Sequence, residues 1–328
     1  MAQVSTATLD LQVELGGVRL KNPVTVASGT FGYGREYEEF VELGRLGAVA
    51  VKGLTLRPRI GNPPPRVVET PAGMLNAIGL ENVGVERYLA EKLPHLREFK
   101  TVIIANISGF AIEEYVELAE RLCAGRGADL IEINVSCPNV RHGGMAFGGD
   151  PVMLEQITRA VVRRSSVPVI VKLSPNVTDI AAMARIVEQA GAAAVSLVNT
   201  FLAMVVDIET RRPVLGNGTG GLSGPAIRPI AVRMVHQVYR AVSIPVVGMG
   251  GIMTAHDALE FTLAGATAVA VGTGNFVNPR AALEVLEGIE AYMRRHNVQS
   301  FRDLVGSLQG EAISPTPYTG SSRTGGSA

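Results

Sequence analysis

The stretch that decides the fold reads IEINVSCPN and covers residues 131–139. Its first half is apolar with strand character, and its second half is polar and contains Pro138. Because proline lacks the N–H group that a central strand needs, the strand should end near Ser136. Ligands of parallel α/β proteins bind at the carboxyl ends of the strands. We therefore expect the polar residues of this stretch, Cys137 among them, to lie at the mouth of a ligand site.

Seven other short runs share the apolar, β-branched character of this strand, and helical patterns separate most of them. Strands that are buried on both faces of a parallel sheet read in this way. Eight such units in about 250 residues are what a (β/α)8 TIM barrel requires. A doubly wound sheet is the alternative, but eight units in series without a second domain favour closure. The expected strands are residues 24–28, 48–52, 102–108, 130–136, 168–173, 194–199, 245–250 and 268–272.

Apolar residues at helical spacing predict helices between these strands. Asp150-Pro151 and Thr178-Asp179 are typical helix starts. Gly127, Gly191 and Gly265 follow helices at points where a left-handed residue is needed. The expected helices are residues 111–125, 152–164, 180–190, 227–242 and 255–264.

Three segments extend this simple plan. Residues 9–22 alternate around a Gly-Gly turn, which predicts an N-terminal β-hairpin that closes one end of the barrel. Residues 53–83 and 200–223 follow strands, so both are elaborated βα loops at the C-terminal mouth. We expect residues 1–313 to form a single barrel domain and residues 314–328 to form a flexible tail.

Composition excludes several classes of protein. Lys+Arg and Asp+Glu number 30 each, and this zero net charge argues against nucleic-acid or anionic-membrane partners. The sequence shows neither a signal-peptide pattern nor an apolar run of roughly 18 residues. Its two cysteines, Cys123 and Cys137, are too few for a disulfide scaffold and are not at metal-ligand spacing. We expect a cytoplasmic protein without a metal site.

Two lysines end apolar strands, which is unusual because lysine is rarely buried without a partner. Val51-Lys52 and Val171-Lys172 occupy corresponding positions of two units. A single lysine here could extend past the barrel rim into solvent. Two lysines at equivalent positions favour contact with a ligand instead.

Glycines near the last strands predict a phosphate site. The loops after strands seven and eight usually grip phosphate in such barrels. Gly250-Gly251 and Gly272-Thr273 stand at these positions, and Gly224 ends a third glycine-rich element. A phosphate monoester such as FMN or a sugar phosphate fits this pattern.

A group of asparagines predicts a ligand with alternating N–H and C=O groups, such as a pyrimidinedione ring, because each amide offers donors and an acceptor. Singly, such asparagines are more often turn formers. They are Asn76, Asn134, Asn139 and Asn199.

Cys137 is the candidate for proton removal. A thiol that titrates near 8.5 can act as a general base once it is partly ionised. Most free cysteines are small buried hydrophobes, and we assign that role to Cys123. His142 lies nearby in the sequence, but its spacing alone does not support a Cys–His pair.

Four motifs of the chain occur together, namely NVSCPN at 134–139, GNPPPR at 61–66, MLNAIGL at 74–80 and GMGGI at 248–252. With these motifs the chain resembles a known family, the class 1 dihydroorotate dehydrogenases, from about residue 9 to residue 310. The resemblance implies an FMN-dependent barrel that oxidises (S)-dihydroorotate to orotate in pyrimidine biosynthesis. The cysteine distinguishes class 1 from class 2, which uses serine as the base. Residues 140–151 are similar to the 1B type, whose partner subunit carries FAD and a [2Fe–2S] cluster and reduces NAD⁺.

The resemblance also implies roles for individual residues. Cys137 would remove the C5 proton of dihydroorotate while the C6 hydride passes to N5 of FMN. Substrate contacts would come from Lys52, Asn76, Ala77, Ile78, Gly79, Leu80, Asn134, Asn139, Asn199 and Thr200. FMN contacts would come from Ser28, Lys52, Gly53, Asn106, Asn134, Lys172, Val198, Gly224, Gly250, Gly251, Gly272 and Thr273. A homodimer of this chain would form the core of a heterotetramer with the electron-transfer subunit.

The sequence is also compatible with other enzyme classes and with a non-catalytic role. The fumarate-dependent class 1A enzymes and dihydropyrimidine dehydrogenase-like reductases share the barrel and the flavin. A Schiff-base aldolase using Lys172 is a different class of enzyme, although it leaves Cys137 and the asparagines without a role. A non-catalytic barrel that only binds a partner leaves all of the mouth residues unexplained.

Overall fold

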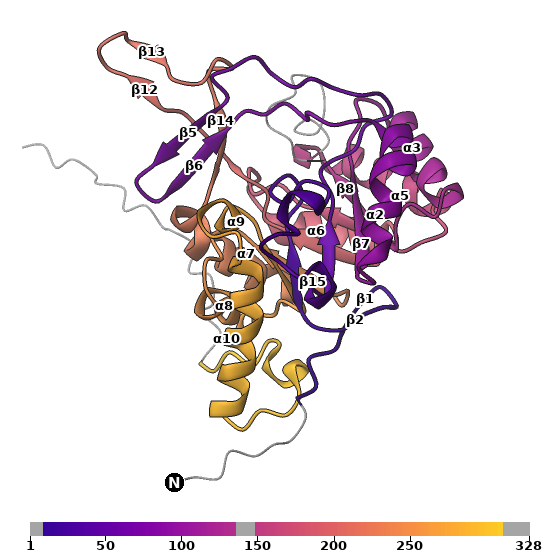
Figure 1. Ribbon diagram of the computed structural model, residues 1–328, viewed down its shortest axis with the longest axis vertical. Helices are drawn as coiled ribbons and strands as arrows, with labels where there is room; N and C mark the ends of the chain where they lie inside the picture. Colours follow the sequence, from indigo (N-terminus) through magenta and orange to yellow (C-terminus); the bar gives the residue numbers. More distant parts are fainter. Residues whose placement is uncertain (1–8, 136–147, 311–328) are drawn as a thin grey trace, which may run out of the picture.

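Eight parallel strands close into a barrel in the computed structural model, which describes residues 9–135 and 148–310 (Figure 1). The expected (β/α)8 barrel is therefore confirmed. Each strand begins within one residue of its expected start. The strands are β3 (Val24–Val26), β4 (Ala48–Ala50), β7 (Val102–Ile107), β8 (Leu130–Asn134), β9 (Val169–Lys172), β10 (Ala194–Leu197), β15 (Val246–Met249) and β16 (Ala268–Val271).

The barrel strands end one or two residues earlier than the sequence suggests. Strand β8 ends at Asn134 instead of Ser136, and β4 ends at Ala50 instead of Lys52. Lys52 and Asn199 come just after the ends of β4 and β10, at the mouth of the barrel. Strand order around the barrel follows the sequence, apart from the inserted strands. The carboxyl ends of all eight strands consequently meet on one face.

Helices surround the barrel and bury its outer side (Figure 1). The five expected helices are confirmed, and further helices precede β7 and follow β16. Short 3₁₀ turns occur at Arg35–Tyr37, Leu43–Arg45, Pro225–Ile227 and Phe301–Leu304, and a π-helical turn at Tyr88–Lys92. The helices are α1 (Val85–Arg87), α2 (Leu93–Glu98), α3 (Ile112–Ala124), α5 (Pro151–Arg164), α6 (Ile180–Gln189), α7 (Arg228–Tyr239), α8 (Ala255–Leu263), α9 (Gly274–Val277) and α10 (Ala281–Arg295).

Both predicted helix starts are capped, the first by Asp150 as expected and the second by Asp179, one residue after the expected cap Thr178. The Asp150 carboxylate accepts hydrogen bonds from the backbone N–H groups of Val152 and Met153. The Asp179 carboxylate accepts one from the N–H of Ala182. Each cap satisfies donors that the first helical turn leaves without a partner.

The helix ends agree with the sequence at two of three positions. Gly191 and Gly265 have φ values of 97° and 121°, so both are left-handed as expected. The prediction for Gly127 is wrong, because Arg126 is the left-handed residue there, with φ of 49°. Helix α3 ends at Ala124, which places the left-handed position of its C-terminal motif one residue before the glycine.

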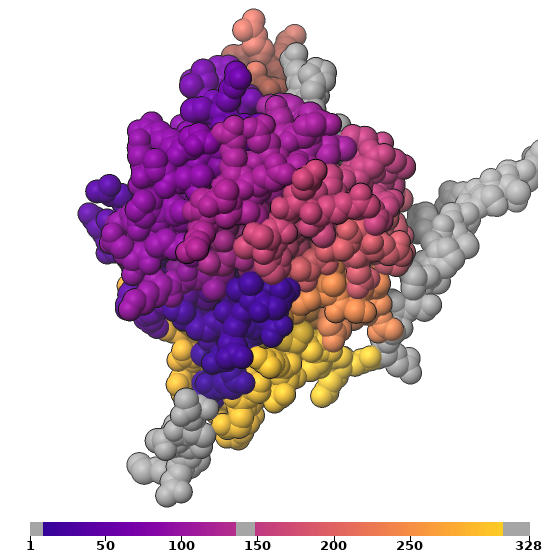
Figure 2. All heavy atoms as spheres, turned by 90° about the vertical axis from the view of Figure 1, so that its right-hand side faces the viewer, coloured from indigo at the N-terminus to yellow at the C-terminus, as the bar shows by residue number. Residues whose placement is uncertain are grey.

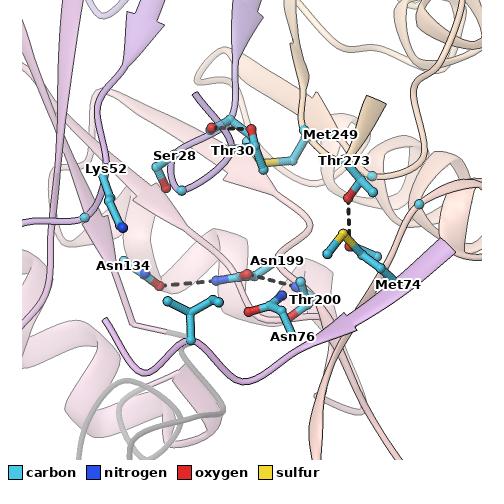
Figure 3. A pocket seen from close by; sticks show the side chains of 18 of the residues that line it. Ser28, Thr30, Lys52, Met74, Asn76, Asn134, Asn199, Thr200, Met249 and Thr273 are labelled. Atoms are coloured by element: carbon cyan, nitrogen blue, oxygen red, sulfur yellow. Dashed lines mark hydrogen bonds between the residues drawn. The ribbon is translucent and has the colours of Figure 1, made fainter. Parts of the chain in front are cut away.

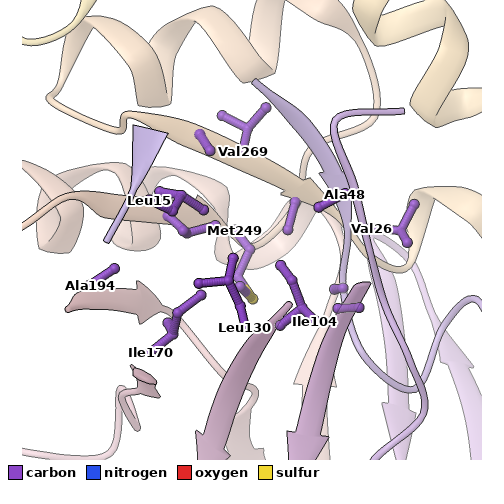
Figure 4. Close-up of a cluster of buried hydrophobic side chains, with 14 of the residues drawn as sticks. Leu15, Val26, Ala48, Ile104, Leu130, Ile170, Ala194, Met249 and Val269 are labelled. Carbon is purple, nitrogen blue, oxygen red and sulfur yellow. The ribbon is translucent and has the colours of Figure 1, made fainter. Parts of the chain in front are cut away.

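The N-terminal hairpin closes the end of the barrel opposite the mouth, as expected. It comprises β1 (Val13–Leu15) and β2 (Val18–Leu20), and Figure 4 shows Leu15 beside the interior barrel residues. A side-chain carbon at Gly16 would lie 2.6 Å from Cβ of Ala193 and 3.0 Å from Cβ of Pro168, just before two barrel strands. The hairpin turn therefore packs directly onto the barrel floor.

The two long loops pair with each other above the mouth, which the sequence did not predict. They form a four-stranded sheet in the order β11-β14-β6-β5 (Figure 1). A small second cluster of buried residues, Leu75, Ala77 and Leu215, packs with this sheet. The strands are β5 (Val67–Thr70), β6 (Gly73–Asn76), β11 (Phe201–Ala203) and β14 (Gly220–Ser223), with a separate hairpin of β12 (Val206–Asp207) and β13 (Arg212–Pro213).

The first described residues lie against the last ones, at the lower edge of the molecule in Figure 2. The N–H of Asp10 donates to the carbonyl of Gln299 at 2.8 Å, and the N–H of Phe301 donates back to the carbonyl of Asp10 at 2.8 Å. None of the helices in the described ranges combines the length and hydrophobicity that crossing a bilayer requires. The expected tail, residues 314–328, lies outside the described residues.

Candidate active site

A cavity of about 430 Å³ lies between the carboxyl ends of the barrel strands and the four-stranded sheet. Both the barrel and the paired loops contribute to its walls, so residues distant in the sequence meet here. Of the expected site residues, those that line it are Ser28, Lys52, Gly53, Asn76, Ile78, Gly79, Leu80, Asn106, Asn134, Lys172, Val198, Asn199, Thr200, Gly224, Gly250, Gly251, Gly272 and Thr273.

Both strand-end lysines reach the cavity and do not extend outward past the rim. Lys172 ends β9 and is only 4% exposed, so its ammonium group is held in the barrel interior. Within the described ranges, Lys172 Nζ donates no hydrogen bond and forms no ion pair. Figure 3 shows the side chain of Lys52 directed into the same space as Asn134 and Asn199. The cavity therefore carries positive charge suited to an electron-rich or anionic ligand.

Three of the asparagines, Asn76, Asn134 and Asn199, lie along one wall of the cavity (Figure 3). Asn199 Nδ2 donates to Asn134 Oδ1 at 3.2 Å, and Asn199 Oδ1 accepts from the N–H of Thr200 at 2.8 Å. Asn76 Nδ2 donates to the carbonyl of Gly221 at 3.5 Å, a bond within the sheet between β6 and β14. These bonds orient the amides and preorganise the wall for a polar ring.

The glycine-rich elements gather at the opposite end of the cavity. Gly250 and Gly251, with φ of 123° and 81°, follow β15. A side-chain carbon at Gly251 would lie 2.8 Å from the carbonyl oxygen of Gly224, so glycine is required for this close approach. Thr273 Oγ1 donates to Ser223 Oγ at 2.7 Å and links β16 to the third element. Backbone N–H groups and hydroxyls of this kind suit a phosphate group.

One expected contact lies away from the cavity, and two other expected site residues fall outside the described ranges. Ala77 is fully buried in the cluster with Leu75 and Leu215, so it packs on the face of the sheet that is turned away from the cavity. Side chains alternate along a strand, and Asn76, which faces the cavity, turns its neighbour away. Cys137 and Asn139 lie outside the described residues, and so does His142.

A buried carboxylate below the cavity was missed from the sequence, although Glu132 stands in the opening stretch. Glu132 is 4% exposed, and its two oxygens accept hydrogen bonds from Asn106 Nδ2 at 2.6 Å and Ser196 Oγ at 2.7 Å. Its signal was an acidic residue in the middle of an otherwise apolar strand, where an unpaired charge is costly.

The upper wall also holds residues that the sequence did not single out. Arg66 and Glu81 form an ion pair at 2.5 Å between Nη2 and Oε2, with both side chains partly exposed. Met74 from the sheet and Phe276 from α9 add apolar surface. Arg66, Met74 and Glu81 belong to the long loop 53–83, which its pairing with the second long loop holds over the cavity.

The fold and this cavity define a TIM-barrel protein with a polar ligand site at its mouth. The chain belongs to the dihydroorotate dehydrogenase family, whose model matches residues 10–293. A protein of Caldicellulosiruptor bescii named "Dihydroorotate dehydrogenase B (NAD(+)), catalytic subunit" is 55% identical over 92% of this chain and 99% of its own length. Relatives with the same name occur in Desulforamulus reducens (56%, over 91% and 98%) and Geotalea daltonii (53%, over 92% and 98%).

Proposed function

We propose that this chain oxidises (S)-dihydroorotate to orotate in pyrimidine biosynthesis, as the FMN-binding catalytic subunit of an NAD⁺-linked enzyme. The observation that carries the proposal is the meeting of strand-end lysines, the amide wall and the glycine-rich end in one cavity. The names of the relatives agree with it. The amides Asn76, Asn134 and Asn199, with Ile78, Gly79, Leu80 and Thr200, would hold the pyrimidine ring and carboxylate of the substrate.

The residues present fit FMN. Asn106 Oδ1 is buried without a hydrogen-bond partner in the described ranges, so it can accept a hydrogen bond from a ligand. The buried Lys172 has no acceptor among the described residues, and Gly250 and Gly251 line the cavity where a phosphate would bind. Ser28, Gly53, Val198, Gly224, Gly272 and Thr273 would complete the contacts. When bound, the flavin supplies an acceptor for the hydride that leaves C6 of dihydroorotate.

The chain itself must remove the second hydrogen as a proton from C5. We assign this step to the Cys137 thiolate, which stands three residues beyond Asn134 in the sequence. Because Asn134 lines the cavity, this short separation allows the thiol to reach a ring bound there. Lys52 would neutralise negative charge between the substrate and the flavin.

Colour is the first test. The purified chain should carry non-covalent FMN, and anaerobic dihydroorotate should bleach its absorbance as the flavin is reduced. A protein that stays colourless after incubation with FMN would contradict the proposal.

The role of Cys137 is tested by Cys137→Ala. We expect the variant to retain FMN but to be bleached at least about a hundredfold more slowly, because general-base catalysis contributes roughly 10²–10⁴-fold. Cys123→Ala is the matched control, since Cys123 lies on α3 away from the cavity. Equal bleaching rates for Cys137→Ala and the unaltered chain would exclude Cys137 as the base.

We further propose that electrons leave through a partner subunit carrying FAD and a [2Fe–2S] cluster, bound to a homodimer of this chain. Efficient turnover of the isolated chain with fumarate would favour the 1A type instead. NAD⁺ reduction that requires a co-purified iron–sulfur subunit would support the 1B type. We also propose a cytoplasmic protein whose residues 1–313 act as one domain.

A further inference from the structure

Glu132 is a buried acid for which the proposed reaction has no direct use. It lies in the middle of β8 with its side chain inside the barrel, and it is 4% exposed. Removing a carboxylate from water is costly unless hydrogen bonds replace the lost hydration. Two bonds do so, from Asn106 Nδ2 on β7 at 2.6 Å and from Ser196 Oγ on β10 at 2.7 Å. The carboxylate thereby bridges two strands beneath the cavity.

These bonds determine which way the amide of Asn106 faces. An ionised carboxylate can only accept hydrogen bonds, so Asn106 must turn its NH₂ group toward Glu132. If the amide were reversed, Asn106 Oδ1 would lie about as close to Glu132 Oε1 as Nδ2 does now, and two acceptor oxygens would repel each other. Asn106 Oδ1 consequently points the other way, and a side-chain carbon at Gly53 would lie 2.9 Å from it. Both Asn106 and Gly53 line the cavity.

We propose that Glu132 is a positioning residue that holds Asn106 Oδ1 toward the cavity, as the acceptor for a hydrogen-bond donor of the bound flavin. The inference rests on the proposed function, since it takes FMN as the ligand. Glu132 lies outside the cavity lining and acts only through Asn106. The orphaned Asn106 Oδ1 is the second observation that supports it, because a buried acceptor without a partner carries a desolvation cost that a ligand relieves.

The test is the dissociation constant of FMN, measured by quenching of flavin fluorescence as apoprotein is added. Glu132→Met removes the acceptor and should weaken FMN binding about tenfold, the value of one hydrogen bond. Glu132→Gln restores an acceptor for Asn106, so its affinity should return to within about threefold of the unaltered chain. Ser196→Ala is the matched control, because it removes the other bond to the same carboxylate. Its FMN affinity should stay within about twofold.

A double-mutant cycle tests whether Glu132 acts through Asn106. In an Asn106→Leu background, Glu132→Met should cause no further loss of FMN affinity. If Glu132→Met does not fold, Glu132→Asp replaces it, because it keeps the charge but withdraws the acceptor by one methylene. Additive losses, or equal losses for Ser196→Ala and Glu132→Met, would overturn the inference. An unaltered chain that binds no FMN would instead refute the proposed function, so the two failures are distinguishable.

Discussion

Two charged side chains of this protein are buried inside the barrel, where the loss of hydration is unfavourable. Lys172 and Glu132 are both 4% exposed inside the barrel, one at the cavity and one below it. Glu132 has two hydrogen bonds, whereas Lys172 has no ion pair or hydrogen bond in the described part of the chain. Functional sites often retain such costs because a ligand offsets them.

Lys172→Met tests whether ligand binding offsets the cost of burying this charge. Removing the ammonium group should weaken FMN binding by about tenfold to a hundredfold, the value of a hydrogen bond from a charged donor. The same change should stabilise the apoprotein, because methionine fills the site without a buried charge. Flavin titration and urea unfolding measure the two effects. Lys21→Met is the control at the barrel floor, where Lys21 Nζ bonds two carbonyls, and it should leave FMN affinity unchanged.

Tyr88 gives a prediction for alkaline pH. Burial raises the pKa of its phenol well above the usual value near 10, and its hydroxyl donates to the carbonyl of Gly127 at 2.7 Å. Below pH 10 the phenol is neutral in both the folded and unfolded states. Above pH 10 it ionises in the unfolded state first, so stability falls as the pH rises.

Tyr88→Phe should lower the free energy of unfolding by about 1 kcal/mol at pH 8, through the lost hydrogen bond. Tyr88→Phe should also reduce the fall in the free energy of unfolding between pH 8 and pH 10.5. The remaining loss comes in part from Tyr33 and Tyr37, whose pKa values burial also raises. Urea midpoints at both pH values give the comparison, and parallel losses in the two proteins would refute the role of Tyr88.

At the scale of elements, local sequence signals predicted the barrel strands and most helices correctly. Apolar runs marked the strands, and Asp150 and Asp179 marked helix starts, because these signals act over a few residues. Gly127 was misread because a helix end one residue earlier moved the left-handed position to Arg126. The sheet formed by the two long loops escaped prediction, since its pairing joins segments more than a hundred residues apart.

The hairpin offers a matched pair of variants. Gly16 and Gly17 both have positive φ values, 57° and 87°, so alanine should strain either position by roughly 1–2 kcal/mol. Only Gly16 is also pressed against Ala193 and Pro168, whereas Gly17 has no neighbour within 4 Å of its added carbon. Gly16→Ala should therefore cost about 1–3 kcal/mol more than Gly17→Ala.

Urea unfolding compares these two variants. Neither should change FMN affinity, because the hairpin closes the end of the barrel opposite the cavity. Equal stabilities would show that the hairpin does not press on the barrel floor.

At the scale of the whole molecule, the cavity joins distant parts of the chain. Its lining runs from Ala27 to Phe276 and includes both long loops. A ligand bound there stabilises the folded state only, since the unfolded chain cannot assemble this surface.

Removal of FMN should therefore lower stability. At a free FMN concentration a hundred times its dissociation constant, the ligand should add about 2.7 kcal/mol to the free energy of unfolding. Thermal unfolding of the apoprotein with and without FMN measures this gain. Riboflavin at the same concentration should add less, because it lacks the phosphate that Gly250, Gly251 and Thr273 would hold. Equal gains from both ligands would contradict the assigned phosphate site.

The sequence by itself determined the barrel, its hairpin and the polar strand-end residues that line the cavity, among them Lys52, Asn134, Lys172 and Asn199. The reason is that a parallel barrel brings every strand's carboxyl end to one face, so polar residues after apolar runs identify the mouth without knowledge of distances. Only the tertiary structure decided what covers that mouth, where Ala77 lies, and that Glu132 orients Asn106. Those features depend on contacts between segments far apart in the chain, which no local pattern encodes.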